Sequence, residues 1–172
     1  MRPKLRVLAT VLAGSLAALT AFSAGPANAA GTVVDTRILP VTGAVDDAGG
    51  TFAGTFALTK FAAENDQLVA IGKLDGTLTD ATGNTVATVS NIPATFPVTA
   101  AQATCTVLDL NLGGVDLNVL GLLVHLDPVH LNISADEGSL IGTLLCLIAG
   151  VLGGVAPSTA AVDPLNQLLP LL

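Results

Sequence analysis

The sequence contains no tryptophan and no tyrosine, and its only aromatic side chains are five phenylalanines in 172 residues. Tryptophan and tyrosine are the usual stacking platforms for nucleic-acid bases and for sugar rings, so their absence argues against both kinds of ligand. Cysteine is also scarce. Cys105 and Cys146 stand far apart in the chain, which excludes the CxxC spacing typical of redox catalysis or zinc binding.

Basic residues are few, and half of them lie in the first six positions. Arg2, Lys4 and Arg6 precede an apolar stretch (7–22) and small residues ending at Ala29, the layout of a secretory signal peptide. We expect cleavage after Ala29, a secreted product and no transmembrane span in the mature chain. The mature chain then has three basic residues against thirteen acidic ones, a net charge of −10. Such a surface repels phosphate backbones and anionic headgroups, so we expect no nucleic-acid partner.

Catalytic motifs are absent as well. No serine of the mature chain stands in a GxSxG elbow, no HExxH pair is present, and no glycine-rich loop precedes a helix. We therefore predict a non-enzymatic protein without a cofactor.

The chain does have the length and apolar content for one domain with a core. We divide it into a signal peptide (1–29), a single β-rich domain (30–156) and an apolar C-terminal tail (157–172). In an exported chain, two cysteines predict a disulfide, here between Cys105 and Cys146.

Runs rich in Thr, Val and Ala alternate with turn clusters over the first half of the mature chain, which predicts successive antiparallel strands. Phe52, Phe56 and Leu58 share one strand face and are candidate core residues. Pro93 and Pro97 predict an edge position or a break in the fourth run. We expect a mainly β fold, an antiparallel sandwich or partly open barrel of about seven strands with a C-terminal helix tied on by one disulfide. The first four strands are expected at 32–45, 51–62, 67–79 and 85–99.

Between the cysteines, the apolar residues alternate with Asp, Asn and His, and their parity changes three times. At Gly113–Gly114 the change predicts a two-residue hairpin. At Leu120–Gly121 it predicts a bulge, and at Asp127–Pro128 a wider turn or a second bulge. The hairpin pairs 112 with 115, 110 with 117 and 108 with 119, which places Asp109 opposite Asn118 and Asn111 opposite Asp116.

The polar face of this region supplies the candidate metal ligands. His125 and Asp127 project from one strand face, and His130 would lie opposite His125 if Asp127–Pro128 were a turn. An extracellular metal-dependent hydrolase is the alternative function that these residues suggest, but a solvated polar face explains them more simply. A second oxygen-rich patch, suited in principle to calcium, consists of Asp109, Asn111, Asp116 and Asn118.

A helix is expected near 139–153, capped by Ser139. Its small residues, Cys146 among them, fall on one face. We expect this face, or a flank of it, to lie near the sheet because Cys146 must reach Cys105. Its bulky face is covered either by a short helix of the tail, starting at Asp163, or by a lipid, another apolar molecule or an envelope partner. The leading hypothesis is a secreted structural or binding module, with a pocket for a lipid or other apolar ligand between sheet and helix. Self-association is a further alternative. The bulky face consists of Leu140, Leu144, Leu147, Ile148 and Val151.

The block TCTVLDLNLGGVDLNVLGLLVHLDPVHLNISA, followed by LIGTLLCLIAG, resembles a family of small exported proteins from actinobacteria. The resemblance covers roughly residues 52–152, and its LDLNxLGLxVHLD portion is the specific part. This chain has Gly114 where the family pattern has Pro. The resemblance implies an exported protein with a β-rich domain and a cysteine-bearing helix, and it assigns no catalytic residue.

Overall fold

The computed structural model describes residues 37–46, 49–152 and 159–172. The expected signal peptide (1–29) and the expected end of the helix at Gly153 lie outside the described residues.

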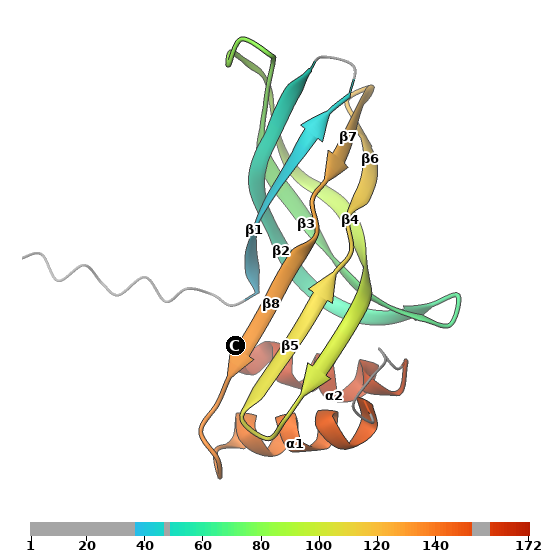
Figure 1. Ribbon diagram of the computed structural model, residues 1–172, viewed down its shortest axis with the longest axis vertical. Coiled ribbons are helices and arrows are strands. Elements are labelled where there is room, and N and C mark those ends of the chain that lie inside the picture. Colours follow the sequence, from blue (N-terminus) through green and yellow to red (C-terminus); the bar gives the residue numbers. More distant parts are fainter. Residues whose placement is uncertain (1–36, 47–48, 153–158) are drawn as a thin grey trace, which may run out of the picture. The chain divides into compact units, whose positions relative to one another are not determined.

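Eight strands follow one another along the chain, and every hydrogen-bonded pair of neighbours is antiparallel (Figure 1). They form a single open sheet that curves round the core so that β4 contacts β6 and β1 contacts β8, which agrees with the partly open barrel alternative. The strands are β1 (Ile38–Val45), β2 (Gly50–Glu64), β3 (Gln67–Thr79), β4 (Thr85–Ala103), β5 (Val107–Leu112), β6 (Val115–Val119), β7 (Leu122–Leu126) and β8 (Val129–Ser134). Their order in the sheet is β6-β7-β1-β2-β3-β4-β5-β8.

Two helices lie together at one end of the sheet (Figure 1). Helix α1 (Leu140–Leu152) contacts β4 and β5, and α2 (Val162–Leu168), flanked by short 3-10 turns, contacts β2. Ser139 caps α1 as expected, because its Oγ accepts a hydrogen bond from the N–H of Gly142 (2.9 Å). The mainly β fold with a disulfide-linked C-terminal helix is therefore confirmed.

The first four predicted strands are present, with β4 extending four residues further than expected, and residues 32–36 of the first predicted strand lie outside the described residues. Pro93 and Pro97 lie in β4 opposite Lys73 and Val69 of β3. β4 pairs with β5 only from Val98 onward, so Pro93 lies where β4 has one neighbouring strand, and Pro97 lies where the second begins, its C=O accepting the N–H of Gly113 (2.7 Å). An edge-like segment is where a missing N–H is tolerated, as the sequence indicated.

The predicted Gly113–Gly114 hairpin is wrong. The tight turn lies at Leu120–Gly121, where Val119 pairs with Leu122. β5 pairs with β8, and β6 pairs with β7, in one common register. The segments β5–β6 and β7–β8 are therefore the two arms of one long hairpin, and Asp127–Pro128 is a break within an arm rather than a turn.

The two breaks in this hairpin explain two of the three parity changes, and the two-residue turn at Leu120–Gly121 explains the third. Gly113–Gly114 and Asp127–Pro128 face each other in the common register, so both arms exchange their inward and outward faces at the same level. On the side of the breaks toward the helices β5 pairs with β4, and on the side toward the Leu120–Gly121 turn β7 pairs with β1. The arms reorient because each half of the hairpin joins a different strand of the sheet.

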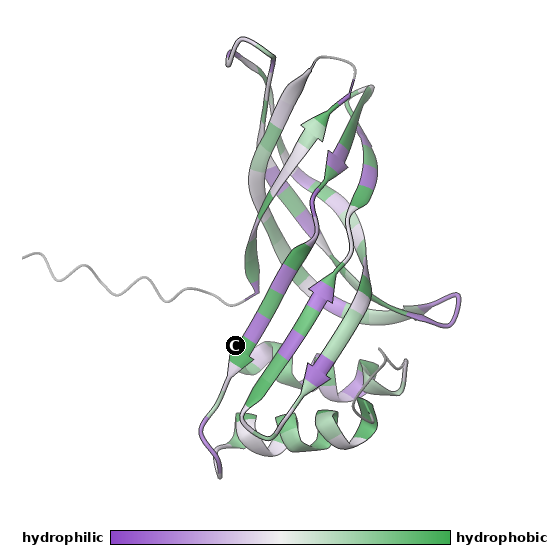
Figure 2. Ribbon diagram, viewed as in Figure 1, coloured by the Kyte–Doolittle hydropathy of each residue, from purple (hydrophilic) through white to green (hydrophobic). Residues whose placement is uncertain are grey.

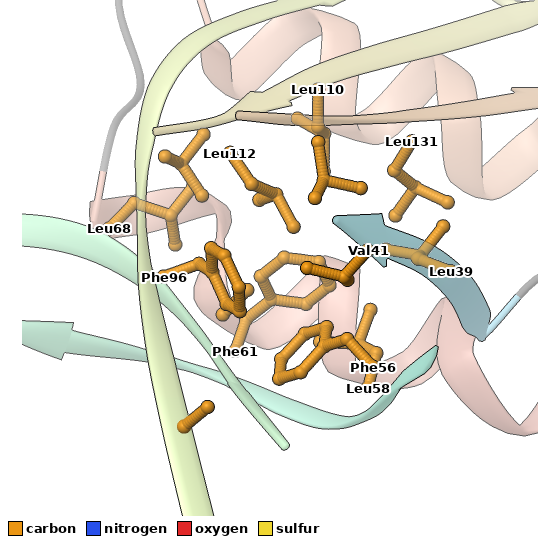
Figure 3. Packing of buried hydrophobic residues seen from close by; sticks show 14 of the residues in the cluster. Leu39, Val41, Phe56, Leu58, Phe61, Leu68, Phe96, Leu110, Leu112 and Leu131 are labelled. Carbon is orange, nitrogen blue, oxygen red and sulfur yellow. The ribbon is translucent and has the colours of Figure 1, made fainter. Parts of the chain in front are cut away.

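The core is apolar, and no buried polar or charged residue occurs in the part of the chain that the structure describes. Figure 3 shows leucines and phenylalanines of β1, β2, β4, β5 and β8 converging on it. Phe56 and Phe96 contact edge to face at 4.7 Å. A Cβ at Gly72 would lie 2.8 Å from the ring of Phe56, so this glycine makes room for the aromatic side chain on the neighbouring strand. The predicted core residues Phe52, Phe56 and Leu58 are buried.

Candidate functional site

The predicted disulfide joins Cys105 to Cys146. Cys105 lies in the tight turn between β4 and β5, where the Oγ1 of Thr104 accepts the N–H of Val107 (3.0 Å). Both cysteines are exposed. The bond therefore fastens α1 to a surface turn rather than to the interior of the sheet.

The structure places a flank of the small-residue face of α1, rather than its centre, against the core. Of the small residues, Gly142 is buried, but Cys146 is exposed. Because Cys105 lies in an exposed turn, Cys146 can reach it from the surface of α1. The side of α1 that enters the core is therefore free to carry bulky residues. The buried bulky residues of α1 are Leu144, Leu145, Ile148 and Leu152.

The bulky face predicted as one unit is consequently divided. Leu144 and Ile148 belong to the core and are not accessible, whereas Leu140 (66% exposed), Leu147 (57%) and Val151 (39%) face solvent. We call these three residues the α1 stripe. No residue of α1 is charged, and Figure 2 shows the helix without a strongly hydrophilic position.

Two hollows open on the surface near the disulfide. One, of about 280 Å³, is lined by both cysteines together with Glu137, Gly138, Gly142 and Thr143. The other, of about 340 Å³, is lined by residues of the β4–β5 region, including Thr104 and Asp109. Neither hollow is lined by the core leucines of the sheet. Buried side chains of the two helices, such as Leu145, Ile148 and Leu165, belong to the same core cluster as those of the sheet.

His125 lies on the outer face of β7 and pairs with an acidic partner. Its Nδ1 lies 2.5 Å from the Oδ1 of Asp116 on β6. The hydrogen bond and the charge of Asp116 raise the pKa of His125, with smaller contributions from the charges of Asp127 and Asp46. The imidazole is thereby oriented and favoured in its protonated form, which is a poor metal ligand.

The other two candidate ligands, Asp127 and His130, do not complete a metal site with His125. Asp127 accepts a hydrogen bond from the Oγ1 of Thr42 (2.8 Å), and His130 pairs with Asn111 across β5 and β8. His130 does not face His125, because the chain runs on through Asp127–Pro128. The described residues contain no group of three His, Cys, Asp or Glu side chains that could hold a metal ion.

The predicted oxygen-rich patch is also separated by the correct register. Asp109 lies opposite Asn132, and Asp116 lies opposite His125. Asn118 holds the β6–β7 turn, because its Oδ1 accepts the N–H of Gly121 (3.0 Å).

Two further residues have structural roles that no local sequence pattern indicates. Asn166 of α2 donates to the C=O of Phe61 and accepts from its N–H (2.9 and 2.7 Å), so it completes the backbone hydrogen bonding of β2 where β1 no longer pairs with it. Leu120 adopts a positive φ of 53° at the tip of the β6–β7 turn. For a bulky L-residue that conformation costs about 1–2 kcal/mol.

Comparison with protein-family models, with curated proteins and with solved structures found no match. In the described part of the chain, the helices are too short or too polar to span a lipid bilayer.

Proposed function

We propose that this protein is an exported, non-enzymatic binding module that attaches to an uncharged lipid surface through the α1 stripe. The observation that carries the proposal is the exposure of Leu140, Leu147 and Val151 on a helix with no charged residue. Export is supported by the N-terminal sequence and by the disulfide, which persists in oxidising compartments.

The spacing of the stripe suits a flat contact. Leu140, Leu147 and Val151 are seven and four residues apart, so they recur on one side of the helix. At about 1.5 Å per residue the stripe is roughly 16 Å long. Thr143 and Gly150, both exposed, lie on the same side and are small, so the large side chains are the first to reach a surface placed against α1.

The energetics favour reversible attachment. Complete burial of a Leu or Val side chain contributes about 1.5–3 kcal/mol, and these three residues have about half of their surface left to bury. Their joint contribution is therefore roughly 3 kcal/mol, which is weaker than the about 5 kcal/mol of a single myristoyl anchor, so the attachment is reversible and depends on a high lipid concentration.

The charge of the chain selects the kind of lipid. With a net charge of −10 after cleavage at Ala29, the mature protein is repelled by anionic headgroups. A zwitterionic or neutral lipid lacks this repulsion and can meet the uncharged helix directly.

Flotation of the mature protein with phosphatidylcholine vesicles tests the proposal. We expect wild-type protein to float with the vesicles and Leu147→Asp to remain in solution, because an aspartate in the middle of the stripe must be desolvated. Leu123→Asp is the matched control, since Leu123 has similar exposure (41%) but lies on β7, at the other end of the sheet (Figure 1).

Addition of phosphatidylglycerol should weaken the flotation of wild-type protein. Equal flotation of wild type and Leu147→Asp would refute the role of the stripe. A loss of flotation in Leu123→Asp alone would place the lipid contact elsewhere.

A further inference from the structure

The β6–β7 turn, at the end of the sheet away from the helices, carries an unfavourable residue (Figure 1). Leu120 is 71% exposed, more than any other large apolar residue that the structure describes, and it has a φ of 53°. Asparagine or glycine is favoured at such a position because each tolerates a positive φ and remains solvated. Leucine satisfies neither requirement. A strained and exposed apolar residue without local compensation points to a function for its side chain.

The rest of the turn is well ordered around this leucine. Gly121 takes the second left-handed position (φ 88°), and its N–H is held by Asn118. Val119, on the inner face, is buried in the core. Leu120 therefore projects from a turn that is rigid on both sides, and the exposed Leu123 on β7 extends its apolar surface.

The surroundings of this tip are acidic. The strands that pair at this end, over the described residues 43–46, 49–55, 74–90 and 115–126, contain four aspartates and no lysine or arginine, and their one histidine, His125, is paired with Asp116. Asp46 is the nearest of these along the ladder, since its N–H donates to the C=O of Leu123 (3.1 Å). Asp116, beside His125, lies on the same outer face.

We infer that Leu120 is the anchor by which this end of the protein docks into an apolar pocket of a protein partner whose rim carries lysine and arginine. A protruding leucine fits a concave apolar site, and carboxylates around it complement a basic rim. Anionic lipid and a second copy of this acidic chain are both opposed by charge. Neutral lipid offers nothing that the carboxylates could recognise. This surface is distinct from the α1 stripe.

Three baits test the inference: immobilised wild type, Leu120→Asn and Leu147→Asp, each exposed to the surface proteins of the cells that produce this protein. We expect one identifiable protein with a basic surface to be retained by wild type and by Leu147→Asp but not by Leu120→Asn. After purification, that protein should bind Leu120→Asn at least about tenfold more weakly than wild type.

The contribution of the carboxylates around Leu120 is tested by a separate measurement. The affinity of wild type should fall as the NaCl concentration is raised, and the double substitution Asp46→Asn/Asp116→Asn should weaken binding and flatten that salt dependence. Leu120→Asn should unfold at a urea concentration no lower than wild type, because asparagine relieves the strain, so its loss of binding cannot be assigned to misfolding.

Three results would overturn the inference. The first is that no protein distinguishes wild type from Leu120→Asn. The second is flotation with phosphatidylcholine vesicles that Leu120→Asn loses, which would make the tip a lipid contact. The third is self-association of wild type, seen by analytical ultracentrifugation and lost in Leu120→Asn. The α1 proposal would survive each of these results, because its own test depends on Leu147.

Discussion

At the scale of single residues, the side-chain amide of Asn166 forms the backbone hydrogen bonds that a neighbouring strand would otherwise form with Phe61 of β2. Beyond the last residue that pairs with β1, the N–H and C=O of Phe61 are satisfied by this one side chain of α2. Part-buried backbone groups that lose their partners carry a desolvation penalty. We expect Asn166→Ala to lower the free energy of unfolding by about 1–3 kcal/mol, measured by urea denaturation.

Gln167→Ala is the matched control for Asn166, since Gln167 is the exposed neighbour on the same helix. Its effect should be within about 0.5 kcal/mol of zero. Equal destabilisation by the two substitutions would mean that α2 is sensitive to any change, and the specific role of Asn166 would be rejected.

His125 is the residue whose charge depends most on its neighbour. Asp116 raises the folded-state pKa of His125, so the protonated form is favoured by folding. The resulting stabilisation is present below the unfolded pKa of about 6.5 and is lost as the pH rises through the higher folded-state pKa. We expect an NMR titration to give a higher pKa for His125 in wild-type protein than for His125 in the Asp116→Asn variant. Identical titration curves would show that the contact with Asp116 does not form in solution.

At the scale of elements, the sequence predicted the strands better than their pairing. The alternation of apolar residues identified β5 to β8, because each strand has one face in the core. It did not identify the turn, since Gly113–Gly114 fits a tight hairpin and leucine at 120 does not. The register was decided by β1 and β4, to which the two halves of the hairpin are joined. Such long-range partners leave no mark in local sequence.

Helix α1 shows the same limit. Helical periodicity located the helix and its cap, but the division of its bulky face depends on the angle at which the helix meets the sheet and α2. Leu144 became a core residue and Leu147 an exposed one, although both are leucines on the predicted face. The candidate lipid contact could therefore be only partly predicted, and the role of Asn166 not at all.

At the scale of the whole molecule, the sheet and the helices are held together in two ways. The disulfide links residues 41 positions apart, and the buried side chains of α1, including Leu145 and Ile148, add an apolar contact. In the chain-entropy view, closing a loop of this length contributes about 4 kcal/mol. A helix of 13 residues has little stability on its own, so its persistence depends on these two attachments.

Removal of the disulfide should therefore affect the helices more than the sheet. We expect Cys105→Ser/Cys146→Ser to unfold with a free energy lower by about 2–5 kcal/mol, with amide hydrogen exchange accelerated most in α1. The sheet should keep its slowest amides, because Phe56, Phe96 and the leucines around them are packed independently of the cysteines. Reduction of wild type with dithiothreitol should reproduce both effects, which separates loss of the bond from effects of the serines. If exchange rose equally in α1 and in β2 to β4, the two parts would be one cooperative unit, and the disulfide would act on the fold as a whole rather than as the fastening of α1.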